Sequence, residues 1–400
     1  MAEEPGLTPD GADASGKVPD PAGRTETQGW SQRKVTIVTG MFGIAAVVVA
    51  WLLGWLPPSS GQVTPNPSPA PSHTGWSRVR WIVTTQGEVR SRPAVLDGVV
   101  YAGSDDDAVY AIDAATGRVL WRRFTGGTIR SGPVVSGGTV YVGSGDNALY
   151  ALSAATGRML WAYHTGSFVN TDPAVAGDLV YTGSDDGTMY AINVTTGKPQ
   201  WTYSTGQPVD SSPAVVGGTV YFGSDDHTIY ALDAASGKPR WTYTTKGPVK
   251  SAPAVAGGNV YVGSGDCWVY AIKAATGKLV WSYETGNWVD SGPAVADGIV
   301  YVGSHDDNVY AFNAASGTIV WKYTTGGGID SSPAVVGGTV YIGTDDGRVY
   351  AINAATGIKR WSYNTAGPVY SSPVVVGSTV YIGSDDDDIY ALSAASVPSG

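Results

Sequence analysis

Eight positions spaced 40 residues apart carry side chains that can bind a ligand or take part in a reaction. Cationic, anionic and amide groups at such positions are suited to a charged ligand or to the polar rim of a partner protein. The sequence around these positions is nearly the same in every copy, so variation at one place favours binding there. Solvated loop residues that are free to vary are the alternative. The eight residues are Arg90, Arg130, Asn170, Asp210, Lys250, Asp290, Asp330 and Tyr370.

A second set of carboxylates follows in short loops that read DDD, GDN, DDG, DDH, GDC, HDD, DDG and DDDD along the chain. Carboxylate oxygens bind hard divalent cations, but Asp also closes hairpins by bonding its own backbone. Recurrence in every copy favours the structural role, because a ligand site needs asymmetry. The exception is the run Asp385, Asp386, Asp387 and Asp388, whose crowded charges would favour a bound cation or would simply be solvated.

Large aromatic residues supply a further candidate site on the same face. Once the repeated Trp and Tyr positions are set aside, the rings left there are Phe168, Trp268, Trp288 and Tyr370. We expect Trp268 and Trp288 to be neighbours beside Cys267, because one lies in an acidic loop and the other in the loop that leaves the same unit. An exposed aromatic pair would anchor a partner or a sugar-like ligand. Packing within the loops is the alternative.

Catalytic and nucleic-acid-binding signatures are not visible in the sequence. His227 and His305 lie in loops two units apart, too far to share a metal, and His73 and His164 add nothing decisive. There is no Ser-His-Asp arrangement, phosphate-binding loop or dinucleotide fingerprint. The formal charge of −10 argues against nucleic acid. The single cysteine, Cys267, excludes an intrachain disulfide framework. We therefore assign no catalytic residue.

The elements that position these residues can be inferred from a repeat that is marked by eight tryptophans. The copy between Arg90 and Gly127 contains four apolar-alternating stretches, SRPAV, GVVYAGS, AVYAIDA and RVLWRRF, separated by turn residues. Four antiparallel strands in a unit of this length are typical of a propeller blade. The tryptophans, which we expect to be structural docking residues, are Trp81, Trp121, Trp161, Trp201, Trp241, Trp281, Trp321 and Trp361.

We therefore predict an all-β fold, an eight-bladed β-propeller of four-stranded antiparallel blades over residues 76–396. The first Trp precedes the first complete copy, so the strand at residues 76–85 must complete blade eight, and residues 397–400 form a C-terminal tail. In a four-stranded meander, the loops that enter strand one and those that join strands two and three emerge on the same face. The eight variable positions and the acidic loops should therefore share one funnel mouth.

One transmembrane helix is predicted ahead of the propeller, at residues 35–56, which carry no charge and are long enough to cross a bilayer. Arg33 and Lys34 precede it, which predicts a cytoplasmic N-terminus. Residues 1–34 read as a disordered acidic tail and residues 57–75 as a Pro/Ser-rich linker. The expected location is the cell membrane, single-pass, with the propeller extracytoplasmic. A cleaved signal peptide is the alternative, although its apolar region is usually shorter.

The segment AIDAATGRVLW, which ends at Trp121, and its copies that begin at Ala231, Ala271 and Ala351 share the pattern A-x-D-x-x-T-G-x-x-x-W, with Asp replaced in the last two. This pattern resembles the tryptophan-docking motif of the quinoprotein alcohol dehydrogenase family, the PQQ-binding-like propellers. The resemblance covers all eight copies. It implies the propeller fold far more strongly than it implies a chemistry.

Two branches of that family frame the function. The enzymes bind pyrroloquinoline quinone and calcium at one mouth, over a vicinal Cys-Cys disulfide, with an Asp base and Glu and Asn metal ligands. This chain has only Cys267, and no catalytic Asp or calcium-binding Glu maps onto it. The other branch is a non-enzymatic scaffold lipoprotein of outer-membrane assembly, tethered through a cysteine near its N-terminus. Here a helix would provide the tether, so the scaffold analogy holds better than the specific assembly role.

The expected function is therefore a membrane-anchored extracytoplasmic propeller that binds a protein or ligand as a scaffold, without catalysis. The expected partners are the membrane, through residues 35–56, and an envelope or extracellular protein. No cofactor is expected, and PQQ and calcium are implied by the resemblance alone. The alternatives are a PQQ-dependent dehydrogenase of alcohols or sugars, and a ligand sensor that signals through its acidic tail.

Overall fold

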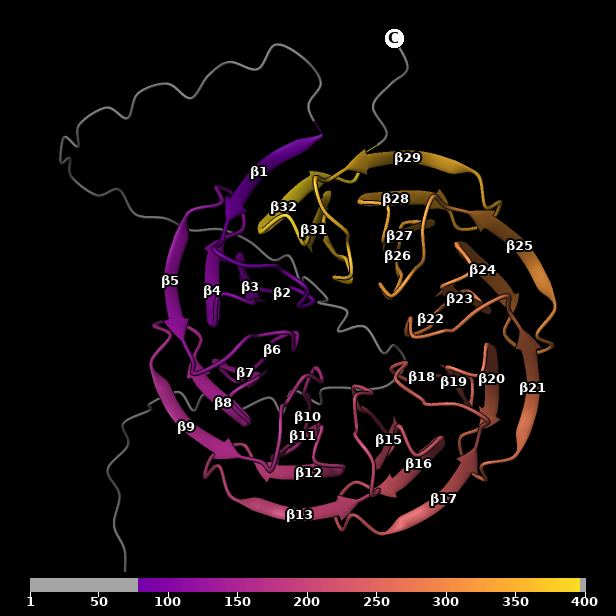
Figure 1. The fold of residues 1–400 in the computed structure, drawn as a ribbon, viewed down its shortest axis with the longest axis horizontal. Helices are drawn as coiled ribbons and strands as arrows, with labels where there is room; N and C mark the ends of the chain where they lie inside the picture. The colour runs from indigo at the N-terminus through magenta and orange to yellow at the C-terminus, as the bar shows by residue number, and fades with distance from the viewer. Residues whose placement is uncertain (1–77, 396–400) are drawn as a thin grey trace, which may run out of the picture. The chain divides into compact units, whose positions relative to one another are not determined.

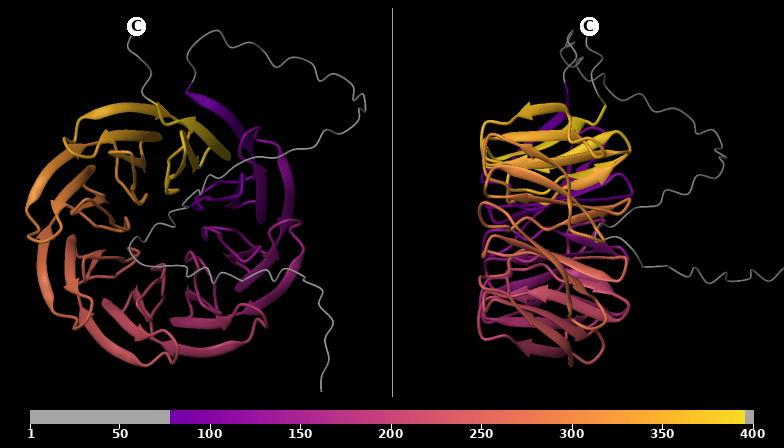
Figure 2. Two further views of the ribbon diagram at one scale, coloured as in Figure 1. Left: turned by 180° about the vertical axis from the view of Figure 1, so that it is seen from behind. Right: turned by 90° about the vertical axis from the view of Figure 1, so that its right-hand side faces the viewer.

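Each 40-residue copy forms one up-and-down sheet, because its alternating apolar residues are separated by turn residues at every strand end. The computed structural model describes residues 78–395, which form eight four-stranded antiparallel sheets around a common axis (Figure 1). The blades form a ring when seen from behind and a single layer when seen from the side (Figure 2). The predicted all-β, eight-bladed propeller is confirmed.

Residues 1–34, 35–56 and 57–75, predicted as tail, transmembrane helix and linker, lie outside the described residues, as do residues 397–400. Within residues 78–395, no helix is both long enough and apolar enough to cross a membrane.

The strands fall into four classes by their position in the blade. The innermost strands are β2 (Ala94–Leu96), β6 (Val134–Ser136), β10 (Ala174–Ala176), β14 (Ala214–Val216), β18 (Ala254–Ala256), β22 (Ala294–Ala296), β26 (Ala334–Val336) and β30 (Val374–Val376). The second strands are β3 (Val99–Ser104), β7 (Thr139–Ser144), β11 (Leu179–Ser184), β15 (Thr219–Gly223), β19 (Asn259–Gly263), β23 (Ile299–Ser304), β27 (Thr339–Thr344) and β31 (Thr379–Gly383).

The two outer classes complete the blades. The third strands are β4 (Ala108–Asp113), β8 (Ala148–Ser153), β12 (Thr188–Asn193), β16 (Thr228–Asp233), β20 (Trp268–Lys273), β24 (Asn308–Asn313), β28 (Arg348–Asn353) and β32 (Asp388–Ser393). The outermost strands are β5 (Val119–Phe124), β9 (Met159–His164), β13 (Pro199–Ser204), β17 (Pro239–Thr244), β21 (Leu279–Glu284), β25 (Ile319–Thr324), β29 (Lys359–Asn364) and β1 (Val79–Thr84). We number the blades one to eight from the blade of β2 to the blade of β30.

Blade eight contains strands from both ends of the described chain. β1 pairs antiparallel with β32, and Trp81 lies opposite Ala391 in the register. The order of this sheet is β1-β32-β31-β30. Figure 1 shows the indigo strand β1 beside the yellow strands of the C-terminal end. The first strand of the chain therefore closes the ring.

The innermost strand of the first blade begins later than predicted. The stretch SRPAV, residues 91–95, was expected to form this strand, but β2 begins only at Ala94. Pro93 has no amide hydrogen to donate to a strand ladder. Ser91 replaces the missing ladder bonds, since its hydroxyl donates to the carbonyl oxygen of Gly103 and accepts from the Gly103 amide, both at 2.8 Å. A side chain therefore takes over the pairing where the backbone cannot continue it.

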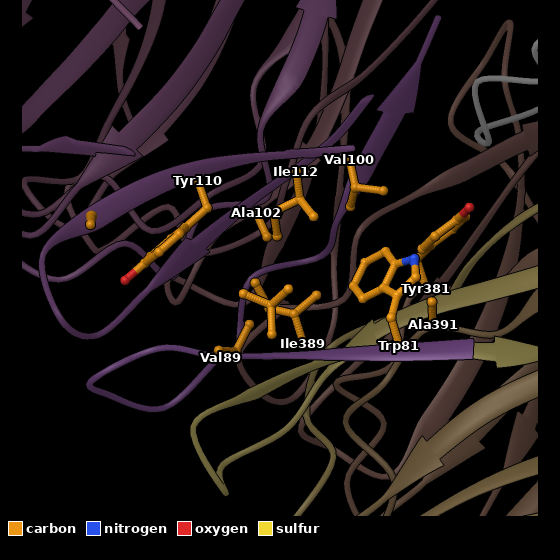
Figure 3. Packing of buried hydrophobic residues seen from close by; sticks show 11 residues of the cluster. Trp81, Val89, Val100, Ala102, Tyr110, Ile112, Tyr381, Ile389 and Ala391 are labelled. Carbon is orange, nitrogen blue, oxygen red and sulfur yellow. The ribbon is translucent and has the colours of Figure 1, made fainter. Parts of the chain in front are cut away.

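Tryptophan joins each blade to the next. The Trp81 indole nitrogen donates to the carbonyl oxygen of Ala114 at 2.9 Å. The ring covers Gly117, whose φ is +74° and where a Cβ atom would lie 2.8 Å from Cγ of Trp81. Figure 3 shows this indole beside Tyr381, with a distance of 5.7 Å between ring centroids. The other seven docking residues, Trp121, Trp161, Trp201, Trp241, Trp281, Trp321 and Trp361, donate in the same way.

Candidate functional site

The eight variable positions meet the acidic loops on one face, as the meander topology predicts. Arg130 in blade two lies 2.9 Å from Asp105 in the loop of blade one. Arg90 in blade one lies 2.9 Å from Asp385 in the loop of blade eight. Each of these contacts spans two adjacent blades. We call this surface the mouth. It consists of the eight variable positions and the first residue of each loop between the second and third strands, namely Asp105, Gly145, Asp185, Asp225, Gly265, His305, Asp345 and Asp385.

The second residue of each acidic loop has a structural role. In blade five, Asp266 accepts a hydrogen bond from the Tyr270 hydroxyl at 2.7 Å and from the Lys246 amide at 2.8 Å. A tyrosine four residues later makes this contact in every blade. The eight carboxylates are Asp106, Asp146, Asp186, Asp226, Asp266, Asp306, Asp346 and Asp386.

The third loop residue adopts a left-handed backbone conformation, with φ of 70° at His227 and 73° at Cys267. Gly, Asn and Asp tolerate this conformation best, and they occupy the other copies. The first residue of each loop is therefore the one left to contact the variable positions. From the sequence, the three loop positions were predicted to form one acidic patch. In the structure, each position has a different role.

Blades three to five bring three carboxylates together around one lysine. The Lys250 ammonium lies 3.3 Å from Asp210 and 3.8 Å from Asp225. Asn170 donates to Asp185 at 3.3 Å. Burial, together with the neighbouring Asp210, raises the pKa of the Asp185 carboxyl to about 7. This part of the mouth is acidic but partly neutralised by a cation of the protein itself.

Blades six and seven contain a second cluster, with a histidine in place of the lysine. The Nε2 atom of His305 lies 2.6 Å from Oδ1 of Asp330. One ligand-type atom each from Asp290, His305 and Asp330 lies within 4.8 Å of the others. The hydrogen bond to Asp330 raises the pKa of His305 to about 8. Burial and the charge of Asp330 raise the pKa of Asp345 to about 6.

The pairing of His305 was not predicted from the sequence, where only its distance from His227 was considered. His305 should instead be compared with Asp330, which occupies the variable position 25 residues later in the sequence. A signal was present in the sequence, since His305 is the one residue other than Asp or Gly at the first loop position.

Trp268 and Trp288, which were expected to be neighbours, contact different aromatic residues. Trp268 begins strand β20 and lies 6.5 Å from the Tyr270 ring. Trp288 is 56% exposed and its ring lies 6.1 Å from that of His305 in blade six. Among residues 78–395, no ring contact joins Trp268 to Trp288. The loop after β21 passes to the next blade, where Trp288 contacts His305.

Phe168 and Tyr370 complete the candidate residues on this face. Phe168 is 50% exposed, and its carbonyl oxygen accepts from the Asp185 amide. The guanidinium carbon of Arg90 lies 5.3 Å from the centre of the Tyr370 ring. That distance allows a cation–π interaction between blades one and eight.

The run Asp385–Asp388 is held by protein contacts. Asp385 pairs with Arg90, and Asp386 accepts from the Tyr390 hydroxyl at 2.7 Å. Asp388 accepts from the Thr84 hydroxyl at 2.6 Å. Cation binding at this run stays a prediction.

Two charged residues in the loops before the innermost strands were not singled out from the sequence. A carboxylate oxygen of Asp172 accepts from the Gly132 amide of the neighbouring blade. Burial raises the pKa of Asp172, and the charge of Arg92 opposes that shift. Both residues stand two positions after the variable set, at a place that also differs between copies.

The sequence pattern of one protein family, described as outer membrane protein assembly factor BamB, matches this chain in overlapping stretches at residues 24–128, 107–214, 204–288 and 265–396. No protein among the curated sequences matches.

Solved structures with the same fold include BamB from Moraxella catarrhalis, with 22% identity, a TM-score of 0.69, and coverage of 79% of this chain and 99% of the other. The computationally designed protein Ika8 has 19% identity and a TM-score of 0.71, with coverage of 78% and 97%. Quinohemoprotein alcohol dehydrogenase from Comamonas testosteroni has 16% identity and a TM-score of 0.67, with coverage of 80% and 77%. At these identities, the likeness shows the fold alone.

Proposed function

Because the chain belongs to the family described as outer membrane protein assembly factor BamB, we propose that it is a non-catalytic scaffold that binds a protein partner at the mouth of its propeller. The mouth is the candidate binding surface, because its residues differ between blades while the surrounding framework is repeated. The repeated Trp and second-loop Asp residues are engaged in contacts within the fold. The variable residues are the ones that remain to distinguish one partner from another.

The charges of the mouth favour a partner with basic side chains. Arg90, Arg130 and Lys250 are each already paired with carboxylates of neighbouring blades. No lysine or arginine among the described residues forms an ion pair with Asp290 or Asp330. Complementary charge increases the rate of encounter and rejects acidic partners.

Two exposed aromatic residues supply apolar contact area beside these charges. Phe168 and Trp288 stand at equivalent positions of blades three and six, each two residues before a variable position. Aromatic residues are common energetic centres of protein interfaces. A basic segment that crosses the mouth would have an aromatic contact at each of these two blades.

Membrane anchoring through residues 35–56, with the propeller outside the cytoplasm, is part of the same proposal. It is supported by the uncharged segment and by Arg33 and Lys34 directly before it. An anchored scaffold meets its partners in two dimensions, so even a weak contact would be occupied.

Cysteine labelling tests the topology. In intact cells, an impermeant maleimide should label a cysteine placed at Ile358 and spare one placed at Thr8, after Cys267→Ser.

The mouth does not fit pyrroloquinoline quinone well. That cofactor is a polycarboxylate and needs cationic partners. Arg90 and Arg130, in adjacent blades, already form ion pairs with Asp385 and Asp105. Half of the remaining mouth residues are aspartates, whose carboxylates repel an anion. This charge pattern supports the scaffold over the dehydrogenase.

The partner experiment is affinity capture of envelope proteins by the full-length chain after cross-linking in its host. The mouth variant is Phe168→Ala with Trp288→Ala, and the control is Ile358→Ala, whose side chain is 68% exposed and lies before β29, at the opposite end of the blade from the acidic loops. We expect the mouth variant to lose a specific partner at unchanged melting temperature, while the control keeps it. Equal capture by both variants would contradict a binding role for the mouth.

A separate measurement addresses the enzyme alternative. The purified chain is mixed with pyrroloquinoline quinone and calcium, and dye-linked oxidation of alcohols and sugars is followed. We expect no saturable cofactor binding and no turnover. Turnover that requires both additions would replace the scaffold proposal.

A further inference from the structure

We propose that Asp290, His305 and Asp330 bind one divalent transition-metal ion, of which Zn²⁺ is the representative, at the junction of blades six and seven. This inference does not depend on the scaffold proposal. The three side chains come from three loops that the fold brings together, namely those before β22, after β23 and before β26. Their ligand-type atoms lie within 4.8 Å of one another.

The spacing of these atoms is close to what a single ion requires. Zinc bonds to imidazole nitrogen and carboxylate oxygen are about 2.0–2.2 Å long, so two ligands of one ion lie at most about 4.4 Å apart. Small rotations of the three side chains are enough to close the remaining gap. The His305 Nε2 atom already lies 2.6 Å from Oδ1 of Asp330, so these two groups face the same point.

The donor set selects the class of ion. An imidazole nitrogen with carboxylate oxygens suits zinc and other first-row transition metals, whereas calcium and magnesium prefer oxygen ligands alone. The combination occurs once around the ring, because only blade six has a histidine at the first loop position. The recurring second-loop carboxylates lack this asymmetry and are held by tyrosine hydroxyls instead.

The charge balance of this junction also differs from that of the other blades. At equivalent junctions, Arg130 pairs with Asp105 and Lys250 with Asp225, so a protein cation faces the loop carboxylate. Here Asp330 faces His305, and Asp345 lies nearby without any ion pair to a lysine or arginine of the described residues. The group that faces the carboxylate at this junction is an imidazole, which becomes a metal ligand once it releases its proton.

Asp345 provides the second observation that points to a ligand. Its Oδ1 atom is buried and has no hydrogen-bond partner among the described residues. Asp146, Asp186 and Asp225 have similar buried oxygens, and the Lys250 ammonium lies 3.8 Å from the other oxygen of Asp225. A Cβ atom built on Gly328 would lie 2.9 Å from Oδ2 of Asp345 and 3.3 Å from Nδ1 of His305. Asp345 and the imidazole therefore border the same space above Gly328, and this carboxylate adds negative charge close to the proposed ion.

The position of the His305 ring is fixed by its neighbours. Its backbone amide donates to the carbonyl oxygen of Trp288 at 2.9 Å, and the Trp288 indole lies edge-on to the imidazole at 6.1 Å. The imidazole is thus held between Trp288 and Asp330, and it needs little ordering on binding. The metal site would also place an ion directly beside one of the exposed aromatic residues of the mouth.

The test uses the purified full-length chain, prepared without a polyhistidine tag and treated with a chelator. Zn²⁺ and Co²⁺ are titrated at pH 7.5 by calorimetry, and the visible absorption of Co²⁺ reports its ligands. We expect one ion per chain and a Co²⁺ spectrum with nitrogen and oxygen ligands. Ca²⁺ should bind at least tenfold more weakly than Zn²⁺.

Variants separate this site from other metal-binding surfaces. His305→Gln and Asp330→Asn should each weaken Zn²⁺ binding at least tenfold, and Asp345→Asn should weaken it less, through the loss of a nearby negative charge, without changing the stoichiometry. The matched control is His227→Gln, in the equivalent loop of blade four, which should bind as the parent does. Circular dichroism melts of each apo variant check the fold.

Two outcomes would overturn the proposal. One is the absence of saturable binding by the folded parent chain, and the other is unchanged affinity in folded His305→Gln and Asp330→Asn. Unchanged partner capture by the Phe168→Ala, Trp288→Ala variant, with Zn²⁺ binding intact, would contradict the scaffold proposal alone.

Discussion

The indole nitrogen of Trp81 in blade eight donates a hydrogen bond to the carbonyl oxygen of Ala114 in blade one, at 2.9 Å. The junction between the two ends of the described chain therefore has the same contact as every junction inside the ring. At this seam the tryptophan is not on a strand that follows β32 in the sequence. The first strand supplies it.

Deletion of residues 76–85 should lower the melting temperature sharply. The deletion removes β1, exposes the edge of β32 and removes Trp81 from its contact with Gly117. Truncation of one large buried side chain costs about 3–5 kcal/mol, and the loss of a whole strand adds to that. Thermal unfolding followed by circular dichroism measures the effect, with deletion of residues 397–400 as the control. An unchanged cooperative melt would refute closure by the first strand.

Replacement of Gly157 by Ala should destabilise the protein more than replacement of Gly137. Both glycines have positive φ, 67° and 57°, so both variants carry a left-handed alanine at about 1–2 kcal/mol. Only the Cβ atom at residue 157 meets another group, since it would lie 2.7 Å from Cε3 of Trp121. Chemical denaturation of the two variants gives the difference. Equal losses would mean that the indole shifts without cost.

Asp226→Ala should destabilise the propeller, whereas Asp225→Ala should affect stability little. Asp226 accepts the Tyr230 hydroxyl at 2.5 Å, and its loss leaves that partly buried group unpaired, at about 1–3 kcal/mol. Asp225 instead faces Lys250, whose side chain is 43% exposed and therefore contributes little through ion pairing. Urea unfolding distinguishes the adjacent positions. The reverse order would contradict the division of roles within the loop.

Asp185 should make stability fall as pH rises from about 4 to about 7. Its folded-state pKa is raised from 3.8 to about 7, so the folded state holds a proton that the unfolded state releases in that range. The stabilising contribution is complete below the unfolded pKa and is lost as pH rises through the folded pKa. Asp185→Asn should gain stability relative to the parent over this window, as measured by denaturation at several pH values.

A second variant checks the cause of this pH dependence. Asp210→Asn removes the neighbouring carboxylate, so the pKa of Asp185 should fall and the pH dependence should weaken. A difference between Asp185→Asn and the parent that does not vary with pH would contradict the assigned shift.

The repeat made most of the fold predictable from the sequence. Each copy contains its own strand and turn signals, and the offset of Trp81 from the first complete copy indicates closure by the first strand. The start of β2 was harder to predict, because it depends on Ser91 bonding to Gly103. A serine or threonine recurs at this position in every copy, but a hydroxyl side chain alone does not indicate that it will replace the backbone pairing of a strand.

The mouth was predictable as a face but not as a set of contacts. The meander topology places variable positions and acidic loops together, yet the pairing of His305 with Asp330 joins two different blades. Blade-to-blade contacts depend on the rotation between sheets, which a single sequence does not encode in any one segment. The ring contact of Trp288 with His305 has the same origin, because the loop after β21 crosses to the next blade.

The place of β1 at the seam also has a mechanical consequence. Any tension applied to the chain before residue 78 reaches the propeller through β1, whose hydrogen bonds to β32 join the ends of the ring. The same strand would therefore transmit force from an anchor and would be the first part of the ring to yield. Its rupture would free the edge of β32 and break the Trp81 contact with Ala114 together, so pulling on the N-terminal segment would open the circle at a defined point.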